Sequence, residues 1–264
     1  MTTAEYSLTD SHCHPHFPPL GEDIAAVCDD MRKNNVGRAL AVATCGAEWT
    51  TVQNLAREHK DMFFAACGVH PLSSEDETDD ESALINACDL EEVLAVGETG
   101  LDFFRGKNTE TMQRQRFAAH IAAARRLKKP LIIHTRDSLK EVMDMLRAEN
   151  ARDAGGVLHC FTGESKDVSA ALDINFVVSF SGIVTFKKSE DMRAIAAKVP
   201  SDGYMIETDA PYLAPTPYRG KTNTPGYVRH VAEVVSAARR QTPAQTAAET
   251  NAVFDRLFSP PPSC

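Results

Sequence analysis

The stretch Pro130-Leu131-Ile132-Ile133-His134-Thr135-Arg136-Asp137 joins a continuous apolar run to a polar end. Such a run predicts a strand that is covered on both faces, as in a parallel sheet. Before it lies Glu110–Lys128, in which apolar residues recur at helical spacing, and after it a second predicted helix, Ser138–Arg147. The stretch therefore predicts one strand of an α/β protein, flanked by helices that cover it.

The same alternation of strand and helix recurs about eight times along the 264 residues. The predicted strands are Ser7–Cys13, Arg38–Thr44, Met62–Val69, Glu92–Gly97, Pro130–His134, Gly156–His159, Phe176–Ser181 and Gly203–Glu207. The predicted helices are Glu22–Asn34, Glu48–His59, Glu81–Ala87, Glu110–Lys128, Ser138–Arg147, Ser165–Leu172, Ser189–Lys198, Pro225–Arg240 and Thr246–Leu257. This order predicts a single-domain α/β protein, a (β/α)8 TIM barrel over residues 1–258 with an extra C-terminal helix, followed by a flexible tail over 259–264.

The composition is that of a globular enzyme, with 43% hydrophobic and 25% charged residues. None of the seven cysteines forms a Cys-x-x-Cys pair, which favours free thiols in a reducing compartment. We find no signal peptide and no apolar segment near the ~20 residues of a membrane span, so we expect a cytoplasmic monomer without a membrane partner. The net charge of −9 disfavours non-specific binding to duplex nucleic acid.

Unusual polar residues follow the predicted strands. Active sites of such barrels lie at the carboxyl ends of the strands. Five of the nine histidines are found there with two carboxylates: His12, His14, His70, His134, His159, Glu98 and Asp209. Side chains at i and i+2 of a strand share a face, so His12 and His14 should point together and Cys13 away. Imidazole and carboxylate ligands suit divalent cations (Mg, Mn or Zn); they exceed the needs of one tetrahedral ion, which predicts two ions bridged by Glu98.

Seven motifs, in this order, resemble those of the TatD family of metal-dependent deoxyribonucleases, within the amidohydrolase-like TIM barrels. They are Asp10-Ser11-His12-Cys13-His14, Gly68-Val69-His70-Pro71, Gly97-Glu98-Thr99-Gly100-Leu101-Asp102, His134-Thr135-Arg136-Asp137, His159-Cys160-Phe161-Thr162-Gly163, Glu207-Thr208-Asp209-Ala210-Pro211-Tyr212-Leu213 and Ala214-Pro215-Thr216-Pro217-Tyr218-Arg219-Gly220-Lys221-Thr222-Asn223. The resemblance implies one ion held by His12, His14, Glu98 and Asp209, and a second held by Glu98, His134 and His159. It also implies 3′ to 5′ exonuclease activity on single-stranded or end-frayed DNA.

These residues suggest metal-assisted hydrolysis of a phosphodiester. We expect three catalytic residues: Asp209 orients or deprotonates the attacking water, Glu98 bridges the ions, and His70 contacts the phosphate or the leaving group. The predicted substrate-binding residues supply cationic or amide donors to phosphate oxygens: Arg136, Arg219, Lys221 and Asn223. The neighbouring aromatic residues Phe103, Phe161 and Tyr212 either stack on bases or pack at the rim of the barrel.

Two other functions stay open. The same ligands could polarise a carbonyl, as in a hydrolase of an amide, a lactone or an aminoacyl ester such as a D-aminoacyl-tRNA deacylase. The basic loop Arg219–Asn223 disfavours this, and so does the place of Lys129, before a strand that ends in histidine. A metal-binding barrel without catalysis is the other alternative. A thiol nucleophile is disfavoured because Cys13 and Cys160 each adjoin a ligand histidine and should face away from the cleft.

Overall fold

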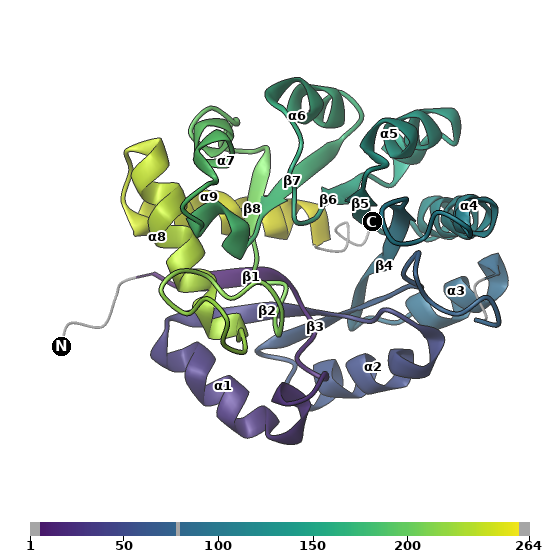
Figure 1. Ribbon diagram of the computed structural model, residues 1–264. Coiled ribbons are helices and arrows are strands. Elements are labelled where there is room, and N and C mark those ends of the chain that lie inside the picture. The colour runs from purple at the N-terminus through teal and green to yellow at the C-terminus, as the bar shows by residue number, and fades with distance from the viewer. Residues whose placement is uncertain (1–5, 78–79, 259–264) are drawn as a thin grey trace, which may run out of the picture.

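The computed structural model describes residues 6–77 and 80–258. Its eight parallel strands follow one another in chain order around a barrel (Figure 1). They are β1 Leu8–Cys13, β2 Val36–Val42, β3 Phe63–Cys67, β4 Val93–Asp102, β5 Leu131–Arg136, β6 Gly156–Leu158, β7 Phe176–Phe180 and β8 Tyr204–Ile206. A parallel bridge between Cys13 and Ala210 joins β1 to the segment after β8. The predicted TIM barrel is confirmed.

Helices surround this barrel (Figure 1). They are α1 Ile24–Lys33, α2 Trp49–Glu58, α3 Glu81–Cys88, α4 Glu110–Leu127, α5 Leu139–Ala148, α6 Ser165–Leu172, α7 Glu190–Ala196 and α8 Val228–Arg239. The hydrophobic core therefore has two layers, one between the helices and the strands and one inside the barrel. Successive strand residues face opposite sides, so one set packs under these helices and the other fills the barrel. The inner set consists of Leu40, Val42, Ala66, Ala95, Ile132, Val157, Val177 and Met205.

The extra C-terminal helix, α9 Pro243–Phe258, closes the end of the barrel at which the strands begin. Its residues Val253, Phe254 and Phe258 pack against the inner set. It begins at Pro243 rather than at the predicted Thr246. The reason is a capping box, in which Thr242 Oγ1 accepts a bond from the Gln245 amide (3.2 Å) and Gln245 Oε1 accepts one from the Thr242 amide (2.8 Å). The predicted flexible tail, 259–264, lies outside the described residues.

Strand β4 is longer than the sequence predicts. The apolar run stops at Gly97, where we predicted its end, but β4 continues to Asp102. Its polar second half still pairs with β5, with Gly100 opposite His134 and Asp102 opposite Arg136. Leu101 of this half packs in the core, but Glu98 and Asp102 face His134 at the mouth of the barrel, so the segment has no apolar run that would reveal a strand.

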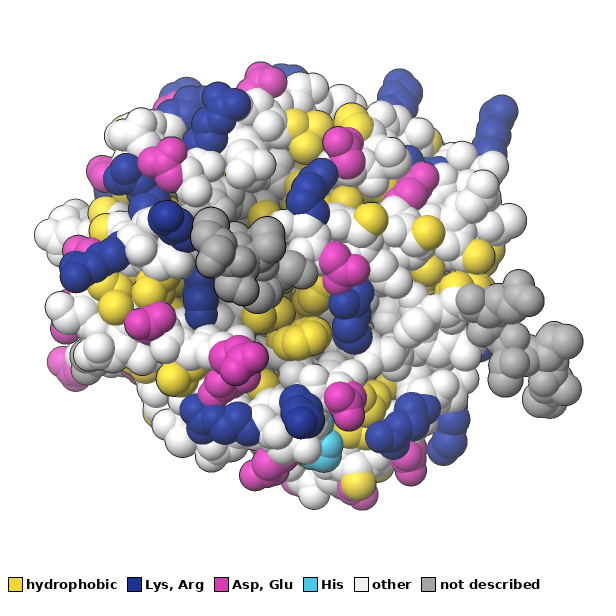
Figure 2. Space-filling model, turned by 180° about the vertical axis from the view of Figure 1, so that it is seen from behind, with side chains coloured by type: hydrophobic (Ala, Val, Ile, Leu, Met, Phe, Trp, Pro, Cys, Tyr) yellow, Lys and Arg dark blue, Asp and Glu magenta, His cyan; other side chains and the backbone are white. Residues whose placement is uncertain are grey.

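On the face of the molecule seen from behind, basic and acidic side chains are intermixed. Among the side chains coloured in Figure 2, Lys and Arg alternate with Asp and Glu and form no continuous basic surface. Within residues 6–77 and 80–258, no helix has the length and hydrophobicity needed to cross a bilayer.

Lys129 fastens the start of β5 to the segment around the start of β4. Its ammonium group donates to the carbonyl oxygens of Cys88, Leu90 and Val93 at 2.5, 2.8 and 2.6 Å. Replacement by methionine leaves these carbonyls without their donor, so we expect Lys129→Met to lower the free energy of unfolding by about 1–3 kcal/mol. Urea denaturation measures this, with the exposed Lys60→Met as control. Equal stability of the two variants would contradict the prediction.

Candidate metal centre

Strand β1 supplies two histidines to the mouth of the barrel. The register between β1 and β2 shifts between Asp10 and Cys13. His12 lies within this irregularity and His14 directly after β1, and both face the same side. Between them, Cys13 lies in the core, where its thiol donates to the carbonyl of Leu40 at 3.4 Å. The alternation of a strand therefore places this pair as the sequence predicts.

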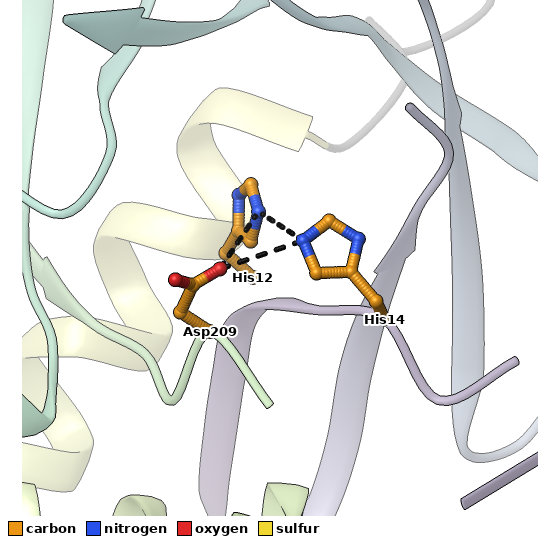
Figure 3. A group of neighbouring side chains, drawn as sticks. All are labelled: His12, His14 and Asp209. Carbon is orange, nitrogen blue, oxygen red and sulfur yellow. Dashed lines mark hydrogen bonds and ion pairs between the residues drawn. The ribbon is translucent and has the colours of Figure 1, made fainter. Parts of the chain in front are cut away.

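Buried hydrogen bonds fix β1 to the segment that follows β8. Asp10 Oδ1 accepts the Thr208 amide at 2.9 Å, and Asp10 Oδ2 accepts the Thr208 hydroxyl at 2.5 Å. The Asp209 amide donates to the carbonyl of His12 at 2.9 Å. Asp209 itself has a φ of 58°, a left-handed conformation that aspartate tolerates better than most residues. These bonds hold the Asp209 carboxylate beside the two histidines of β1 (Figure 3).

His12, His14 and Asp209 form a first cluster of possible metal ligands (Figure 3). His12 Nε2 lies 3.2 Å from His14 Nε2, and Asp209 Oδ1 lies 3.7 and 3.4 Å from these two atoms. Two ligand atoms each about 2.1 Å from a tetrahedral ion are roughly 3.4 Å apart, so the spacing fits a cation. His14 Nδ1 lies 2.7 Å from the carbonyl of Val42, which accepts its proton and leaves the Nε2 lone pair for the ion.

Glu98 links this cluster to a second one. Its Oε2 lies 3.4 Å from His12 Nε2 and 3.8 Å from His14 Nε2. Its Oε1 lies 2.9 Å from His159 Nε2, 3.1 Å from His134 Nδ1 and 3.5 Å from His70 Nε2. Each oxygen thus faces a different group of imidazoles, which is the arrangement of a bridging carboxylate. The structure brings all the predicted ligands together, and His70 with them.

The charges of these groups determine their protonation in the absence of an ion. Burial opposes the charge of Glu98, but His159, His70 and the other imidazoles hold the pKa of its carboxyl well below its usual range. Burial lowers the pKa of His70 to about 4, so its imidazole is neutral at pH 7. Burial opposes the charge of His14, His134 and His159, but the neighbouring carboxylates hold the pKa of each of these imidazoles above its usual value. An ion that binds here therefore displaces protons from them, because imidazoles bind metal ions in the neutral form.

Two further carboxylates, to which the sequence analysis assigned no role, lie behind the ligand histidines. Asp102 Oδ2 is 3.2 Å from His134 Nε2, and Glu207 Oε1 is 3.4 Å from His159 Nδ1. A carboxylate that accepts the second N–H of a ligand imidazole fixes its orientation and makes it a stronger donor. Spacing could have found them, because Asp102 is four residues after Glu98 on one strand face and Glu207 is two residues before Asp209.

We expect Asp102→Asn to weaken metal binding about 10- to 100-fold, because the amide keeps the shape of the side chain but loses the charge behind His134. Titration of the metal-free protein with Mn²⁺ or Zn²⁺ measures the affinity. The exposed Asp61→Asn serves as the charge-matched control. An affinity for Asp102→Asn equal to that of the control would remove Asp102 from the centre.

The cleft above the clusters also contains three of the predicted substrate-binding residues, Arg136, Arg219 and Lys221. The fourth assignment is corrected. Asn223 is fully buried, and its Nδ2 donates to the carbonyls of Thr208 and Tyr212 at 2.9 and 2.6 Å. Its amide holds the loop after β8 instead of reaching the cleft, a role that a polar residue in a basic loop does not reveal from sequence.

The three aromatic residues beside the metal motifs were expected either to stack on bases or to pack, and they differ in position. Phe103 and Tyr212 line the cleft, so they are placed to contact a substrate. Phe161 is buried in the core, so its role is packing.

Cys160 faces the cleft, contrary to the prediction. The alternation of side chains no longer applies, because β6 ends at Leu158 and Cys160 has a left-handed φ of 46°. Burial raises the pKa of its thiol well above the usual value, and the charges of Asp209 and Glu207 raise it further. The thiol is therefore protonated at neutral pH, which disfavours a nucleophilic role for a different reason from the one predicted.

Comparison with known proteins agrees with this centre. A family model for TatD-related DNases matches residues 9–259. The uncharacterized metal-dependent hydrolase YcfH of Escherichia coli K12 is 41% identical over 254 residues, which are 95% of either chain. The 3′-5′ ssDNA/RNA exonuclease TatD of a Rahnella species is 29% identical over 244 residues, covering 90% of this chain and 93% of that one.

A solved structure has the same architecture. The crystal structure of YjjV, a TatD homologue from Escherichia coli K12, superposes with a TM-score of 0.89 at 27% identity, covering 96% of this chain and 98% of that one. Both the order of the motifs and the closed barrel are thus accounted for by common descent. The chain belongs to the TatD family of metal-dependent hydrolases.

Proposed function

We propose that the protein is a metal-dependent phosphodiesterase, and more narrowly a deoxyribonuclease that removes nucleotides from the 3′ ends of single-stranded or frayed DNA. The main support is the position of Glu98, whose two oxygens face separate histidine groups in a cleft that also contains Arg219 and Lys221. The 3′ to 5′ direction is carried over from the name of the Rahnella relative.

Two divalent cations fit the ligands in this proposal. His12, His14, Glu98 and Asp209 would hold one, and Glu98, His134 and His159 the other, with Mg, Mn and Zn as candidates. When bound, such a pair activates water and offsets charge on the attacking and leaving oxygens of a phosphodiester. His70 also lies beside Glu98 and His134, but its Nδ1 accepts the amide of Leu72 at 3.1 Å, so its Nε2 carries the proton of the neutral imidazole and can donate it in a hydrogen bond.

The residues around the ions perform the remaining tasks. Burial opposes ionisation of Asp209, but the hydrogen bond from His14 and the charges of both β1 histidines hold the pKa of its carboxyl below the usual value. Asp209 is thus an anion at neutral pH that orients the attacking water and accepts its proton. The uncharged His70 donates a hydrogen bond to the phosphate or the leaving oxygen, and Arg219 and Lys221 bind the neighbouring phosphates.

The alternative reaction at a carbonyl, such as deacylation of D-aminoacyl-tRNA, uses the same ligands. A carbamylated lysine, which some barrels of this kind would use between two ions, finds no support in Lys129, because its ammonium group is bound by three backbone carbonyls. A cytoplasmic location and a monomeric state stay predictions from the sequence.

Activity of the metal-reconstituted protein tests the proposal. The substrates are single-stranded DNA, duplex DNA, RNA and D-aminoacyl-tRNA, each with Mg²⁺, Mn²⁺ or Zn²⁺. We expect mononucleotides to be released fastest from single-stranded DNA, with 5′-labelled strands shortened stepwise from the 3′ end. Deacylation faster than nucleotide release would establish the alternative. No turnover of any of these, nor of bis-p-nitrophenyl phosphate with Mn²⁺, would indicate a non-catalytic protein.

A further inference from the structure

The rim of the metal cleft carries exposed hydrophobic side chains. Among the described residues, three large ones are at least about a third exposed: Leu72 (36%), Phe104 (55%) and Tyr212 (54%). Leu72 and Tyr212 line the cleft, and Phe104 stands between two residues that do, Phe103 and Arg105. Exposed apolar groups that gather at one site indicate contact with a ligand.

The ring of Phe104 packs against Arg136, a cationic side chain that also lines the cleft. The guanidinium carbon of Arg136 lies 4.4 Å from the centre of the Phe104 ring. Arg136 is exposed, lines the cleft and makes no salt bridge within residues 6–77 and 80–258. The neighbouring Phe103 differs, because it is half-buried and its ring is covered by Arg114, which Glu110 and Glu141 hold in place. An aromatic ring and a planar guanidinium are the two side-chain surfaces on which nucleobases stack.

The cleft has two walls that differ in charge, one beside Phe104 and one formed by the loop 219–221. The wall beside Phe104 mixes basic and acidic side chains, and the latter are Asp137, Glu141 and Asp144. The loop 219–221 contributes Arg219 and Lys221 without an acidic partner in the same loop. Phosphates favour the second wall, so the bases of a bound strand turn toward the first.

We propose that Phe104, with Arg136 on its ring, is a stacking site for a base of single-stranded nucleic acid, while the loop 219–221 holds the backbone. This rests on the proposed phosphodiesterase function. Phe104 is two residues beyond Asp102, at most roughly 7 Å of extended chain, so the stacked base lies close to the scissile phosphate. Bases paired in a duplex cannot turn onto this surface, which gives the site its preference for unpaired strands.

Substitutions that separate stacking from hydrophobic bulk test this site. The variants are Phe104→Leu, which keeps an apolar side chain, and Phe104→Tyr, which keeps the ring. The ligands are a fluorescent thymidine hexamer and an abasic hexamer with the same phosphates. Anisotropy in EDTA measures binding without turnover, and kcat and KM are measured with Mn²⁺. Arg126→Ala, an exposed cation near the end of α4, is the control for general loss of charge.

We expect Phe104→Leu to weaken binding of the thymidine strand and to raise its KM roughly 5- to 100-fold, since stacking contributes that much per base. Phe104→Tyr keeps the ring, so its binding of the thymidine strand and its KM should stay close to those of the wild-type protein. Neither substitution should alter binding of the abasic strand. Equal losses on both strands, no loss on either, or no rescue by tyrosine would overturn the stacking site. If the base-dependent binding is found but no nucleic acid is cleaved, the proposed function fails and the stacking site stands.

Discussion

Replacing Glu98 by alanine is expected to remove both cations and to reduce phosphodiester hydrolysis by at least about 10³-fold. Loss of a single preorganised electrostatic group already costs about 10²–10³ in rate. Within the part of the chain that the structure describes, Glu98 is the carboxylate whose two oxygens face both histidine groups. Metal content per chain, measured by mass spectrometry after dialysis, should fall together with activity. Mn²⁺ is expected to raise the melting temperature of the wild-type protein, because it binds the folded state, and this rise should disappear in Glu98→Ala.

The control for this variant is Glu91→Gln, which removes an exposed carboxylate outside the cleft. Glu98→Gln adds a second comparison, since it keeps the side-chain shape and loses the charge. An active Glu98→Ala protein with a full complement of metal would refute the bridging role and, with it, the assignment of the two sites.

Asp209→Asn should give the second-largest effect, with a different signature. Without a carboxylate to accept the proton of the attacking water, kcat is expected to fall about 10²- to 10⁴-fold. The second ion site does not use Asp209, so this variant should retain metal at Glu98, His134 and His159. Combined measurement of kcat, KM and metal content distinguishes loss of the base from loss of the whole centre.

The matched control is the exposed Asp173→Asn. A wild-type kcat in Asp209→Asn would assign proton transfer to another group. Loss of all metal in Asp209→Asn would instead show that the two ions bind as one unit.

Much of the centre could be predicted from the sequence because polarity marks the end of each strand. Glu98, His134 and Asp209 follow apolar runs, and His12 and His14 stand at the end of the first predicted strand. A barrel gathers the ends of its strands at one mouth. The fold class followed from the same alternation. These inferences use local periodicity and one topological rule, and need no knowledge of how neighbouring strands are aligned.

Other features depend on the register between strands. Asp102 reaches His134 because β4 continues beside β5, and Glu207 approaches His159 because β8 lies two strands from β6. The orientation of Cys160 follows from a left-handed residue after β6, and the burial of Asn223 from the folding of its loop onto Thr208. Spacing alone marks Asp102 and Glu207 as candidates, but it does not show which histidine each contacts. Those contacts, and the positions of Cys160 and Asn223, depend on residues that are distant in the chain.

The contact between β1 and the segment after β8 has a consequence for biosynthesis. The carboxylate of Asp209, which completes the site of His12 and His14, is translated some two hundred residues after them. A nascent or prematurely terminated chain therefore lacks a finished centre, whatever length of barrel it has assembled.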